Sequence, residues 1–368
     1  MHIEVSSLVK EYGGHNVLHN LSFTVHSGEL LTLLGPSGCG KTTTLRCVAG
    51  LEKADAGSIV IGGTTVASNK IFVPAEKRKV GMVYQSYALW PHMTVYENIA
   101  YGLRLRRLSK NEIAERVKKI LDLMGMYGLR RRLVTDLSGG EQQRVAVARS
   151  VIVEPNVLLF DEPLSNLDAG LREHMRFELR NLQKRLGITT IYVTHSQEEA
   201  FAIADRIGLM ARGKIVQIGT SRELYYQPVD ETAASFLGLS NFLTGQPTIL
   251  ENPLASLRTH DGLEILFKKQ RELKPGTEAT LLVRPRDVKI HKKRPPFERN
   301  VWPCKIVRST FMGESMDCVV SIGEQLLRVI ADPEDISDND IFYAQIPLDK
   351  CLMLPDRSHP DSVDEQTR

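Results

Sequence analysis

The segment Gly35-Pro-Ser-Gly-Cys-Gly-Lys41-Thr42 restricts the fold of this chain more than any other feature. It fits the pattern G-x-x-x-x-G-K-[ST] in full. It follows a short apolar run, Leu30–Leu34, and it precedes residues 41–48, whose pattern predicts a helix that ends at Gly50. A strand, a glycine-rich turn and a helix in this order form a phosphate-binding loop. The sequence therefore predicts an α/β fold around a nucleotide site.

Each residue type in this loop has a reason to be there. The glycines let backbone N–H groups close around the β- and γ-phosphates, and the start of the helix adds a dipole that favours anions. Lys41 would place its charge between the phosphates, the Thr42 hydroxyl would ligate Mg²⁺, and Thr43 would contact the α-phosphate. The predicted cofactor-binding residues of the loop are Gly35, Pro36, Ser37, Gly38, Cys39, Gly40, Lys41, Thr42 and Thr43.

Two further segments carry chemistry. The apolar run Val157–Asp161 ends at two adjacent carboxylates, Asp161 and Glu162. A carboxylate at the end of a buried strand can reach a metal ion, usually through water, although such a pair is common in isolation as a strand cap. Between the loop and this strand lies Leu137-Ser138-Gly139-Gly140, before a predicted helix over residues 142–150. Ser138 and the N–H groups after it would form a second anion site at a helix start, which ATP binding alone does not require.

These three segments, in this order, resemble the nucleotide-binding subunit of an ATP-binding-cassette (ABC) transporter. The resemblance covers residues 2–240 through specific motifs and residues 242–355 through weaker ones. It implies a P-loop NTPase cassette that hydrolyses ATP with Mg²⁺. Three other classes share part of the pattern. An ABC protein of DNA repair would need a long coiled-coil insertion, a translation ATPase would carry two cassettes, and a P-loop small-molecule kinase would not need residues 137–144.

The resemblance also implies roles for residues outside the loop. Asp161 is the expected Mg²⁺ ligand, and Glu162 is the expected general base that polarises the attacking water. Gln85 matches a glutamine that touches Mg²⁺ and the hydrolytic water, and His195 matches a switch histidine that reaches the γ-phosphate. Tyr12 matches the aromatic residue that stacks on adenine, with an ordinary strand aromatic as the alternative.

In the family, the segment around Ser138 faces the γ-phosphate that is bound to a second subunit. The resemblance therefore implies a head-to-tail dimer of two copies, which ATP closes and hydrolysis opens. Glu141 stands where the family often has Gln. Asn166 and Asp168 match a loop that links the two sites across the interface. The residues predicted to contact the second ATP are Ser138, Gly139, Gly140, Gln142 and Asp168.

Residues 86–150 differ in character from the α/β core around them. Apolar residues recur at helical spacing over residues 111–126, which predicts an inserted helical subdomain. The family docks the helices of its membrane partner on the segment from Ser86 to Met93. An exposed Trp90 and Met93 would fit that role, and the alternative is that both pack inside the subdomain. We expect the basic residues of this region, Arg104, Arg106, Arg107, Lys110 and 130–132, to form a solvated face.

Beyond residue 240, short β-favouring runs alternate with turn signals, which predicts a small all-β domain over residues 241–355 and a flexible tail over 356–368. A cassette followed by such a domain is similar to importer subunits for sugars, polyamines, ferric ions, phosphonates and glycerol phosphate. Their C-terminal part is an oligonucleotide-binding-like (TOBE) barrel, and residues 283–288 and 313–320 carry this resemblance. It implies permease subunits, a second copy and, indirectly, an extracellular or periplasmic solute-binding protein as partners. The solute is not encoded here.

Composition limits the remaining possibilities. The 368-residue chain has a formal net charge of +3, which is too weak and too mixed to indicate nucleic acid as a partner. No signal peptide is evident, and no apolar stretch approaches the roughly 20 residues of a spanning helix. Five scattered cysteines indicate a reduced compartment. We therefore expect a peripheral protein at the cytoplasmic face of the inner membrane.

Overall fold

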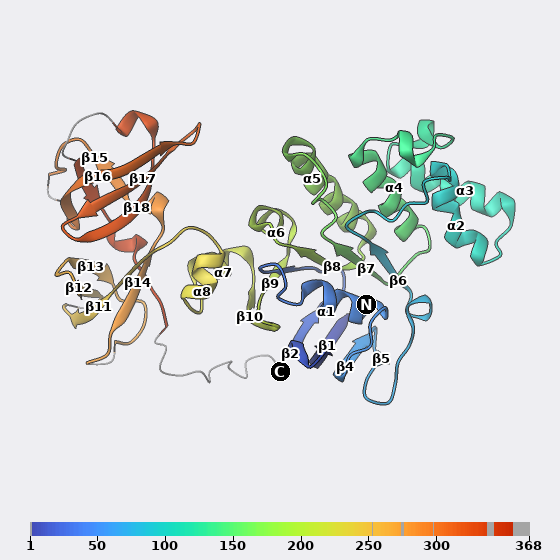
Figure 1. The fold of residues 1–368 in the computed structure, drawn as a ribbon, viewed down its shortest axis with the longest axis horizontal. Coiled ribbons are helices and arrows are strands. Elements are labelled where there is room, and N and C mark those ends of the chain that lie inside the picture. Colours follow the sequence, from blue (N-terminus) through green and yellow to red (C-terminus); the bar gives the residue numbers. More distant parts are fainter. Residues whose placement is uncertain (1, 252, 274–275, 297, 337–341, 356–368) are drawn as a thin grey trace. The chain divides into compact units, whose positions relative to one another are not determined.

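The structure is a computed structural model, which describes residues 2–251, 253–273, 276–296, 298–336 and 342–355. The predicted tail, residues 356–368, lies outside the described residues. The chain divides into two compact units, Met1–Ser221 and Arg222–Arg368 (Figure 1). The predicted domain limit at residue 240 stays a prediction. In the described residues, no helix has the length and apolar character that crossing a membrane requires.

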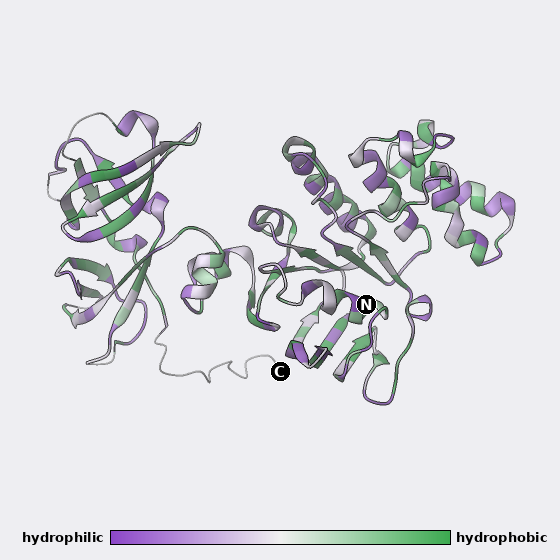
Figure 2. Cartoon of the chain, viewed as in Figure 1, coloured by the Kyte–Doolittle hydropathy of each residue, from purple (hydrophilic) through white to green (hydrophobic). Residues whose placement is uncertain are grey.

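A six-stranded, mostly parallel sheet forms the centre of the first unit. Its order is β10 (Lys214–Gly219), β9 (Arg206–Ala211), β3 (Leu30–Leu34), β8 (Thr189–Thr194), β7 (Val157–Asp161) and β6 (Val80–Val83). Only β10 is antiparallel to its neighbour, β9, with which it forms a hairpin. Every residue of β3, β7 and β8 is buried, because both faces of the sheet are covered. Figure 2 shows these central strands as mostly hydrophobic.

A second, antiparallel sheet covers one side of this centre. Its order is β2 (His15–Val25), β1 (Ile3–Tyr12), β4 (Ala56–Ile61) and β5 (Thr64–Ala67). Helix α1 (Lys41–Ala49) shares one hydrophobic core with both sheets. The helix ends at Gly50, which has a left-handed backbone with φ 81°, as its sequence position predicts. The phosphate-loop segment thus connects a buried strand, β3, to a largely buried helix, α1.

Three helices lie between β6 and β7 in the chain: α2 (Val95–Leu105), α3 (Lys110–Leu123) and α4 (Gly139–Val151). Since β6 and β7 are adjacent strands, these helices are an insertion, which confirms the predicted subdomain. They pack around a core that they share with α5 (Ala169–Leu186), and Figure 1 shows them gathered at the β6 and β7 side of the unit. Helix α6 (Gln197–Ile203) follows β8.

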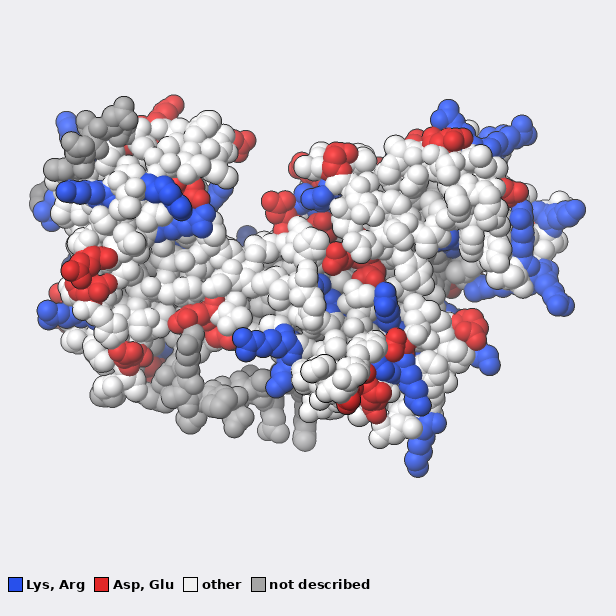
Figure 3. All heavy atoms as spheres, viewed as in Figure 1, with Lys and Arg blue, Asp and Glu red and all other residues white. Residues whose placement is uncertain are grey.

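The outer surface of the inserted helices is basic. Figure 3 shows Lys and Arg side chains over the region of α2 and α3. Arg104, Arg106, Arg107 and Lys110 are all exposed, in agreement with the solvated face that we expected.

The second unit contains two short helices and ten strands in its described residues. Helices α7 (Ser221–Tyr226) and α8 (Glu231–Phe236) come first. One sheet has the order β13 (Glu264–Lys268), β12 (Leu254–Thr259), β11 (Asn241–Ile249), β14 (Ala279–Val283) and β20 (Leu352–Met353). The other has the order β15 (Lys289–His291), β19 (Phe342–Gln345), β16 (Val301–Phe311), β17 (Met316–Ile322) and β18 (Gln325–Ala331). One core serves both sheets, which confirms an all-β C-terminal region; the TOBE assignment stays a prediction.

A buried arginine ties α7 and α8 to the sheets of the second unit. Arg284 is 2% exposed, and its guanidinium lies 4.4 Å from the centroid of the Tyr225 ring. Its Nη1 donates to the carbonyl oxygens of Ala234 and Gly238, and its Nη2 donates to that of Tyr225. Burial lowers the pKa of Arg284. The carbonyl groups therefore take the place of a carboxylate partner.

We expect Arg284→Met to lower the free energy of unfolding of the second unit by about 2–4 kcal/mol, because it leaves buried carbonyl groups without donors. The measurement is urea unfolding followed by the fluorescence of Trp302, in a Trp90→Phe background so that only the second unit is observed. Arg286→Met is the matched control, since Arg286 is exposed and only two residues away. Equal unfolding midpoints for the two variants would contradict the role of Arg284.

Candidate nucleotide site

The carboxyl ends of four adjacent parallel strands bring the predicted site residues together. The loop of residues 35–42 follows β3, His195 follows β8, Glu162 follows β7, and Gln85 comes two residues after β6. The strands end level with one another, since Leu34 is opposite Thr194, Val193 is opposite Asp161, and Phe160 is opposite Val83. In open α/β sheets, ligands bind at this edge.

The loop backbone is built to approach an anion closely. A Cβ atom at Gly35 would lie 2.2 Å from the carbonyl oxygen of Met210, so this position accepts only glycine. Gly40 has φ 102° and stands at the start of α1. No side chain caps α1, and no acidic residue lies in its first turn. The first N–H groups of the helix are therefore available to phosphate oxygens.

Lys41 is a buried cation whose ammonium group is bound by backbone carbonyl oxygens. It is 4% exposed, and its Nζ donates to the carbonyl oxygens of Gly35 (2.7 Å) and Pro36 (2.9 Å). No carboxylate of the described chain forms an ion pair with it. A buried ammonium group is stable only with strong acceptors around it, and phosphate oxygens would supply both the acceptors and the charge. The residues of the loop therefore fit a nucleotide phosphate.

The oxygen atoms at the proposed metal position also fit a hard cation. Thr42 Oγ1 donates to Asp161 Oδ1 at 2.8 Å, although the two residues are 119 positions apart. Asp161 is 7% exposed and has no ion-pair partner in the part of the chain that the structure describes. Burial raises the pKa of its carboxyl above the ordinary value, and the hydrogen bond from Thr42 acts in the opposite direction. A hydroxyl and a carboxylate are ligands that Mg²⁺ prefers.

Glu162 and His195, the predicted base and the predicted switch histidine, are in direct contact. His195 Nδ1 lies 3.0 Å from Glu162 Oε2, and the Glu162 N–H donates to the carbonyl oxygen of Val193. Glu162 has φ 45°, a left-handed backbone that is uncommon for a residue with a Cβ and that is concentrated at functional sites. This backbone conformation ends the extended course of β7, whose last residue is Asp161.

Glu199 was not predicted as a site residue, and it stabilises the end of β8 next to His195. It is buried, and its Oε2 accepts hydrogen bonds from the hydroxyl groups of Thr194 and Tyr192. Thr194 immediately precedes His195, so these bonds fix the end of β8. The only signal in the sequence was an acidic residue four positions after His195, on a helix whose cap is Ser196.

The Ser138 segment forms a second cluster, away from the loop. Ser138 caps α4: its Oγ accepts from the Glu141 N–H and donates to Glu141 Oε2. A Cβ atom at Gly139 would touch Leu167. These contacts place the start of α4 beside the loop that carries Asn166 and beside Asp168, which caps α5. In the described residues, no hydrogen bond joins Ser138 to the phosphate loop.

A hydrogen bond from Asn166 helps to connect the two clusters. Asn166 Nδ2 donates to the carbonyl oxygen of Gln85 at 2.9 Å. The Gln85 side chain is exposed at the edge of the sheet, and Gln142 donates instead to the carbonyl oxygens of Val134 and Leu137. The segment after Gln85 is thereby linked to the loop beside Ser138.

Tyr12, Trp90 and Met93 are only partly accessible to the partners predicted for them. Tyr12 ends β1 with 43% of its surface exposed, and Lys10 lies 4.9 Å from its ring centroid. This leaves room for a stacking partner without placing one. Trp90 and Met93 are half-buried rather than exposed, because Trp90 packs against Tyr101 with ring centroids 4.3 Å apart. The two side chains thus lie between the exposed and the buried alternatives, and the permease contact stays a prediction.

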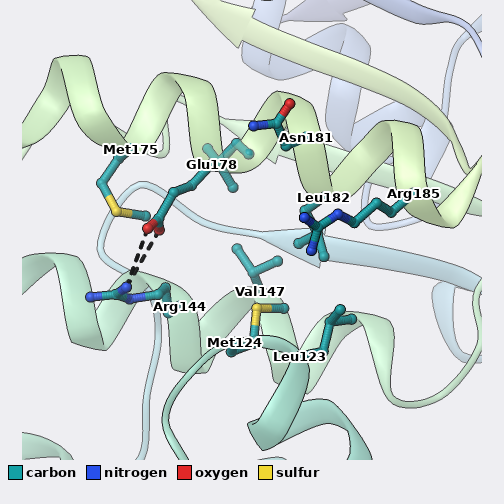
Figure 4. Close-up of a pocket in the computed structure, with 10 residues that line it drawn as sticks. Leu123, Met124, Arg144, Val147, Met175, Glu178, Asn181, Leu182 and Arg185 are labelled. Atoms are coloured by element: carbon teal, nitrogen blue, oxygen red, sulfur yellow. Dashed lines mark hydrogen bonds and ion pairs between the residues drawn. The ribbon is translucent and has the colours of Figure 1, made fainter.

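A cavity of about 230 Å³ lies between α5, α4 and the end of α3 (Figure 4). Figure 4 shows Arg144 of α4 pointing toward Glu178 of α5, with Arg144 Nη1 3.4 Å from Glu178 Oε1. The lining of the cavity is mostly apolar and includes Met124, Val147 and Met175. None of the residues predicted for nucleotide binding lines this cavity.

An ATPase of the phosphate-loop class, with a helical insertion between two parallel strands, is the kind of protein that this fold and site define. Residues 18–165 match the family model described as ABC transporter. The chain is 42% identical over 325 residues to the "Fe(3+) ions import ATP-binding protein FbpC" of Vibrio cholerae, covering 88% of this chain and 89% of that protein. The chain belongs to the ABC transporter family, among the ATP-binding subunits of importers.

Other relatives agree with this placement. A protein of the same name from Brucella abortus is 45% identical over 315 residues, with 86% of each chain covered. The "Spermidine/putrescine import ATP-binding protein PotA" of Nostoc is 40% identical over 325 residues, with 87% of this chain and 84% of that protein covered. The solved structure of cbiO1 from Clostridium perfringens, part of the ABC transporter complex cbiONQ, has a TM-score of 0.56 and 28% identity, covering 60% of this chain and 89% of that one. The protein is thus an ATPase that binds ATP with Mg²⁺ and couples its hydrolysis to solute import.

Proposed function

We propose that this subunit energises a binding-protein-dependent importer by the ATP-driven closing and opening of a dimer of two copies. The observation that supports this most is the separation of two anion-binding helix starts in one chain. The loop before α1 is bonded to Asp161 through Thr42, whereas in the described residues Ser138 at the start of α4 forms no hydrogen bond to that loop. In a dimer with a two-fold axis, the phosphate loop of each copy would face the Ser138 segment of the other copy, and the two copies would form two composite sites.

In this proposal, each site residue has one task. Lys41 exchanges its carbonyl partners for the oxygens of the β- and γ-phosphates. Thr42 and Asp161 hold Mg²⁺, with Gln85 as a further oxygen donor, and the bound ion would neutralise phosphate charge. Glu162 orients the attacking water and accepts its proton, while His195 holds both Glu162 and the γ-phosphate. Ser138 and the first N–H groups of α4 contact the γ-phosphate of the other copy.

The partners and the solute are further parts of the proposal. The segment from Ser86 to Met93 lies directly after Gln85, and it would contact the cytoplasmic helices of permease subunits. The chain would then sit peripherally at the cytoplasmic face of the inner membrane and meet the solute-binding protein only through the permease. The relatives reported above support ferric ion as the first solute to test and polyamines as the second; sugars, phosphonates and glycerol phosphate complete the set.

The test is an affinity pull-down of the tagged chain from detergent-solubilised native membranes, with the retained proteins identified by mass spectrometry. We expect one or two polytopic permease subunits. The recovered complex is then reconstituted in proteoliposomes, with its binding protein on the side opposite to the ATPase subunit. Radioactive ferric ion should cross the membrane only when ATP and Mg²⁺ are present on the side of the ATPase subunit. Recovery of ribosomal or DNA-repair proteins without any membrane protein would overturn the importer role and favour a non-transport ABC ATPase.

A further inference from the structure

A strained turn follows Gln85. Tyr87 and Ala88 are consecutive residues with φ 63° and φ 49°, and neither is a glycine. Two adjacent left-handed residues with Cβ atoms persist only where the surroundings hold them. Tyr87 is 5% exposed, but its hydroxyl group is buried without a hydrogen-bond partner in the described structure. The side chain of Tyr87 therefore contributes packing to the turn, and the restraint on the backbone comes from elsewhere.

Arg149 provides that restraint. Its Nη1 donates to the Ala88 carbonyl oxygen at 2.6 Å, and its Nη2 donates to the Tyr87 carbonyl oxygen at 2.8 Å. The planar guanidinium thus holds both strained residues with one rigid group. The guanidinium carbon also lies 4.9 Å from the centroid of the Trp90 ring. The signal in the sequence was a lone arginine in the otherwise small and apolar stretch from Val145 to Val151.

The rest of the segment is fixed to α2. Asn98 is fully buried, its Oδ1 accepts from the Trp90 N–H, and its Nδ2 donates to the carbonyl oxygens of Trp90, Met93 and Thr94. Asn98 on α2 and Arg149 on α4 therefore both hold the segment from Tyr87 to Thr94, and the Val134 N–H also donates to the Met93 carbonyl oxygen. A movement of α4 relative to α2 changes the distance between Asn98 and Arg149.

Helix α4 connects this turn to the Ser138 cluster. Ser138 caps the start of α4, and Arg149 lies 11 residues later, about 16 Å along the helix. An α-helix of this length behaves as a stiff rod, so a displacement at its start reaches its end. The turn at its end is strained, and Arg149 binds two of its carbonyl groups, so a movement of α4 acts directly on the turn.

From this geometry we propose that Arg149 is a positioning residue, which transmits the movement of α4 on closure to the turn Tyr87–Ala88 and so to the segment from Ser86 to Met93. The inference rests on the proposed function, because it takes the Ser138 cluster as the sensor of ATP on the other copy. Arg149 touches neither ATP nor the reacting atoms in this proposal. Loss of Arg149 should uncouple the segment and leave ATP binding in place.

Trp90 offers a direct readout in the full-length chain. The chain has two tryptophans, so Trp302→Phe leaves Trp90 as the only one. We expect Mg²⁺ with a non-hydrolysable ATP analogue to change the emission of Trp90 at concentrations where light scattering detects the dimer. Arg149→Gln should lose most of this change, while the affinity for a fluorescent ATP analogue stays within about threefold. Arg149→Lys should also lose it, because one ammonium group cannot reproduce the planar fork.

The matched control is Arg116→Gln. Arg116 lies on α3 of the same inserted region and pairs with Glu112 and Glu154, away from the turn. We expect this variant to keep the full Trp90 response and the same ATP affinity as the parent.

A double variant separates the shape of the turn from its link to α4. Ala88 is exposed, and a glycine there adopts the left-handed backbone without a Cβ conflict. Ala88→Gly added to Arg149→Gln should therefore keep the left-handed turn, but the response of Trp90 to the analogue should stay lost, because α4 is no longer bonded to the turn. A full response in Arg149→Gln, or its return on adding Ala88→Gly, would overturn the inference while the proposed function stands. A parent that binds the analogue without forming a dimer would overturn the proposed function itself.

Discussion

The Glu162→Gln variant should bind ATP normally and turn it over about 100- to 10,000-fold more slowly, which is the usual contribution of a general base. The amide has the size of the carboxylate and keeps a hydrogen bond to His195, which now lies 3.0 Å away, but it cannot accept the proton of the attacking water. Steady-state phosphate release measures turnover, and a fluorescent ATP analogue measures binding. Because closure would no longer be released by hydrolysis, size-exclusion chromatography with ATP and Mg²⁺ should show a persistent dimer.

The control for this variant is Glu198→Gln. Glu198 is an exposed carboxylate on α6 that pairs with Arg176, so the same chemical change there should leave turnover at the parent level. Parent-level turnover in Glu162→Gln would show that another group accepts the proton. A loss of ATP affinity in Glu162→Gln would show instead that Glu162 acts mainly in holding the nucleotide.

For Ser138→Arg we expect hydrolysis to fall by at least about 100-fold, the scale associated with losing a transition-state donor. The long side chain would cover the N–H groups at the start of α4 and prevent closure on the ATP of the other copy. The phosphate loop and the Thr42–Asp161 contact lie in a separate cluster, so one chain should still bind ATP with parent affinity. Phosphate release, analogue binding and the ATP-dependent dimer are measured together.

Ser109→Arg is the matched control for the loss of a helix cap. Ser109 caps α3 and accepts from the Glu112 N–H, as Ser138 does for α4 with Glu141. The substitution should destabilise α3 slightly and leave hydrolysis near the parent level. If Ser138→Arg abolished ATP binding by the single chain, the Ser138 cluster would belong to its own phosphate loop, and the composite-site proposal would fail.

The emission of Trp90 can be measured in both of these variants. Glu162→Gln should hold the dimer closed, and in that state the emission of Trp90 should stay at its ATP-bound value for as long as the dimer persists. Ser138→Arg should prevent the Trp90 response altogether, even though ATP is bound. The same fluorophore therefore distinguishes a failure to close from a failure to reopen.

Local sequence was sufficient wherever function depends on residues that are neighbours in the chain. The loop from Gly35 to Thr42, the end of α1 at Gly50 and the buried strands β3, β7 and β8 were predictable, because glycine content and apolar runs act over a few residues. The insertion of α2–α4 was predictable from a change of period between two strand-like runs. The β character of the second unit followed from short runs between turn signals.

Tertiary structure decided every contact between distant residues. The Thr42–Asp161 bond and the Glu162–His195 contact depend on the order and register of parallel strands, which packing on both sheet faces sets and no local pattern encodes. The left-handed turn Tyr87–Ala88 contains no glycine, so the sequence gives no local signal for it. The turn is held by Arg149, which lies 61 and 62 positions away and binds its two carbonyl groups. Sequence by itself determined which chemical groups the protein has, and only the fold decided which of them meet, because strand register and buried hydrogen bonds are properties of the whole packed core.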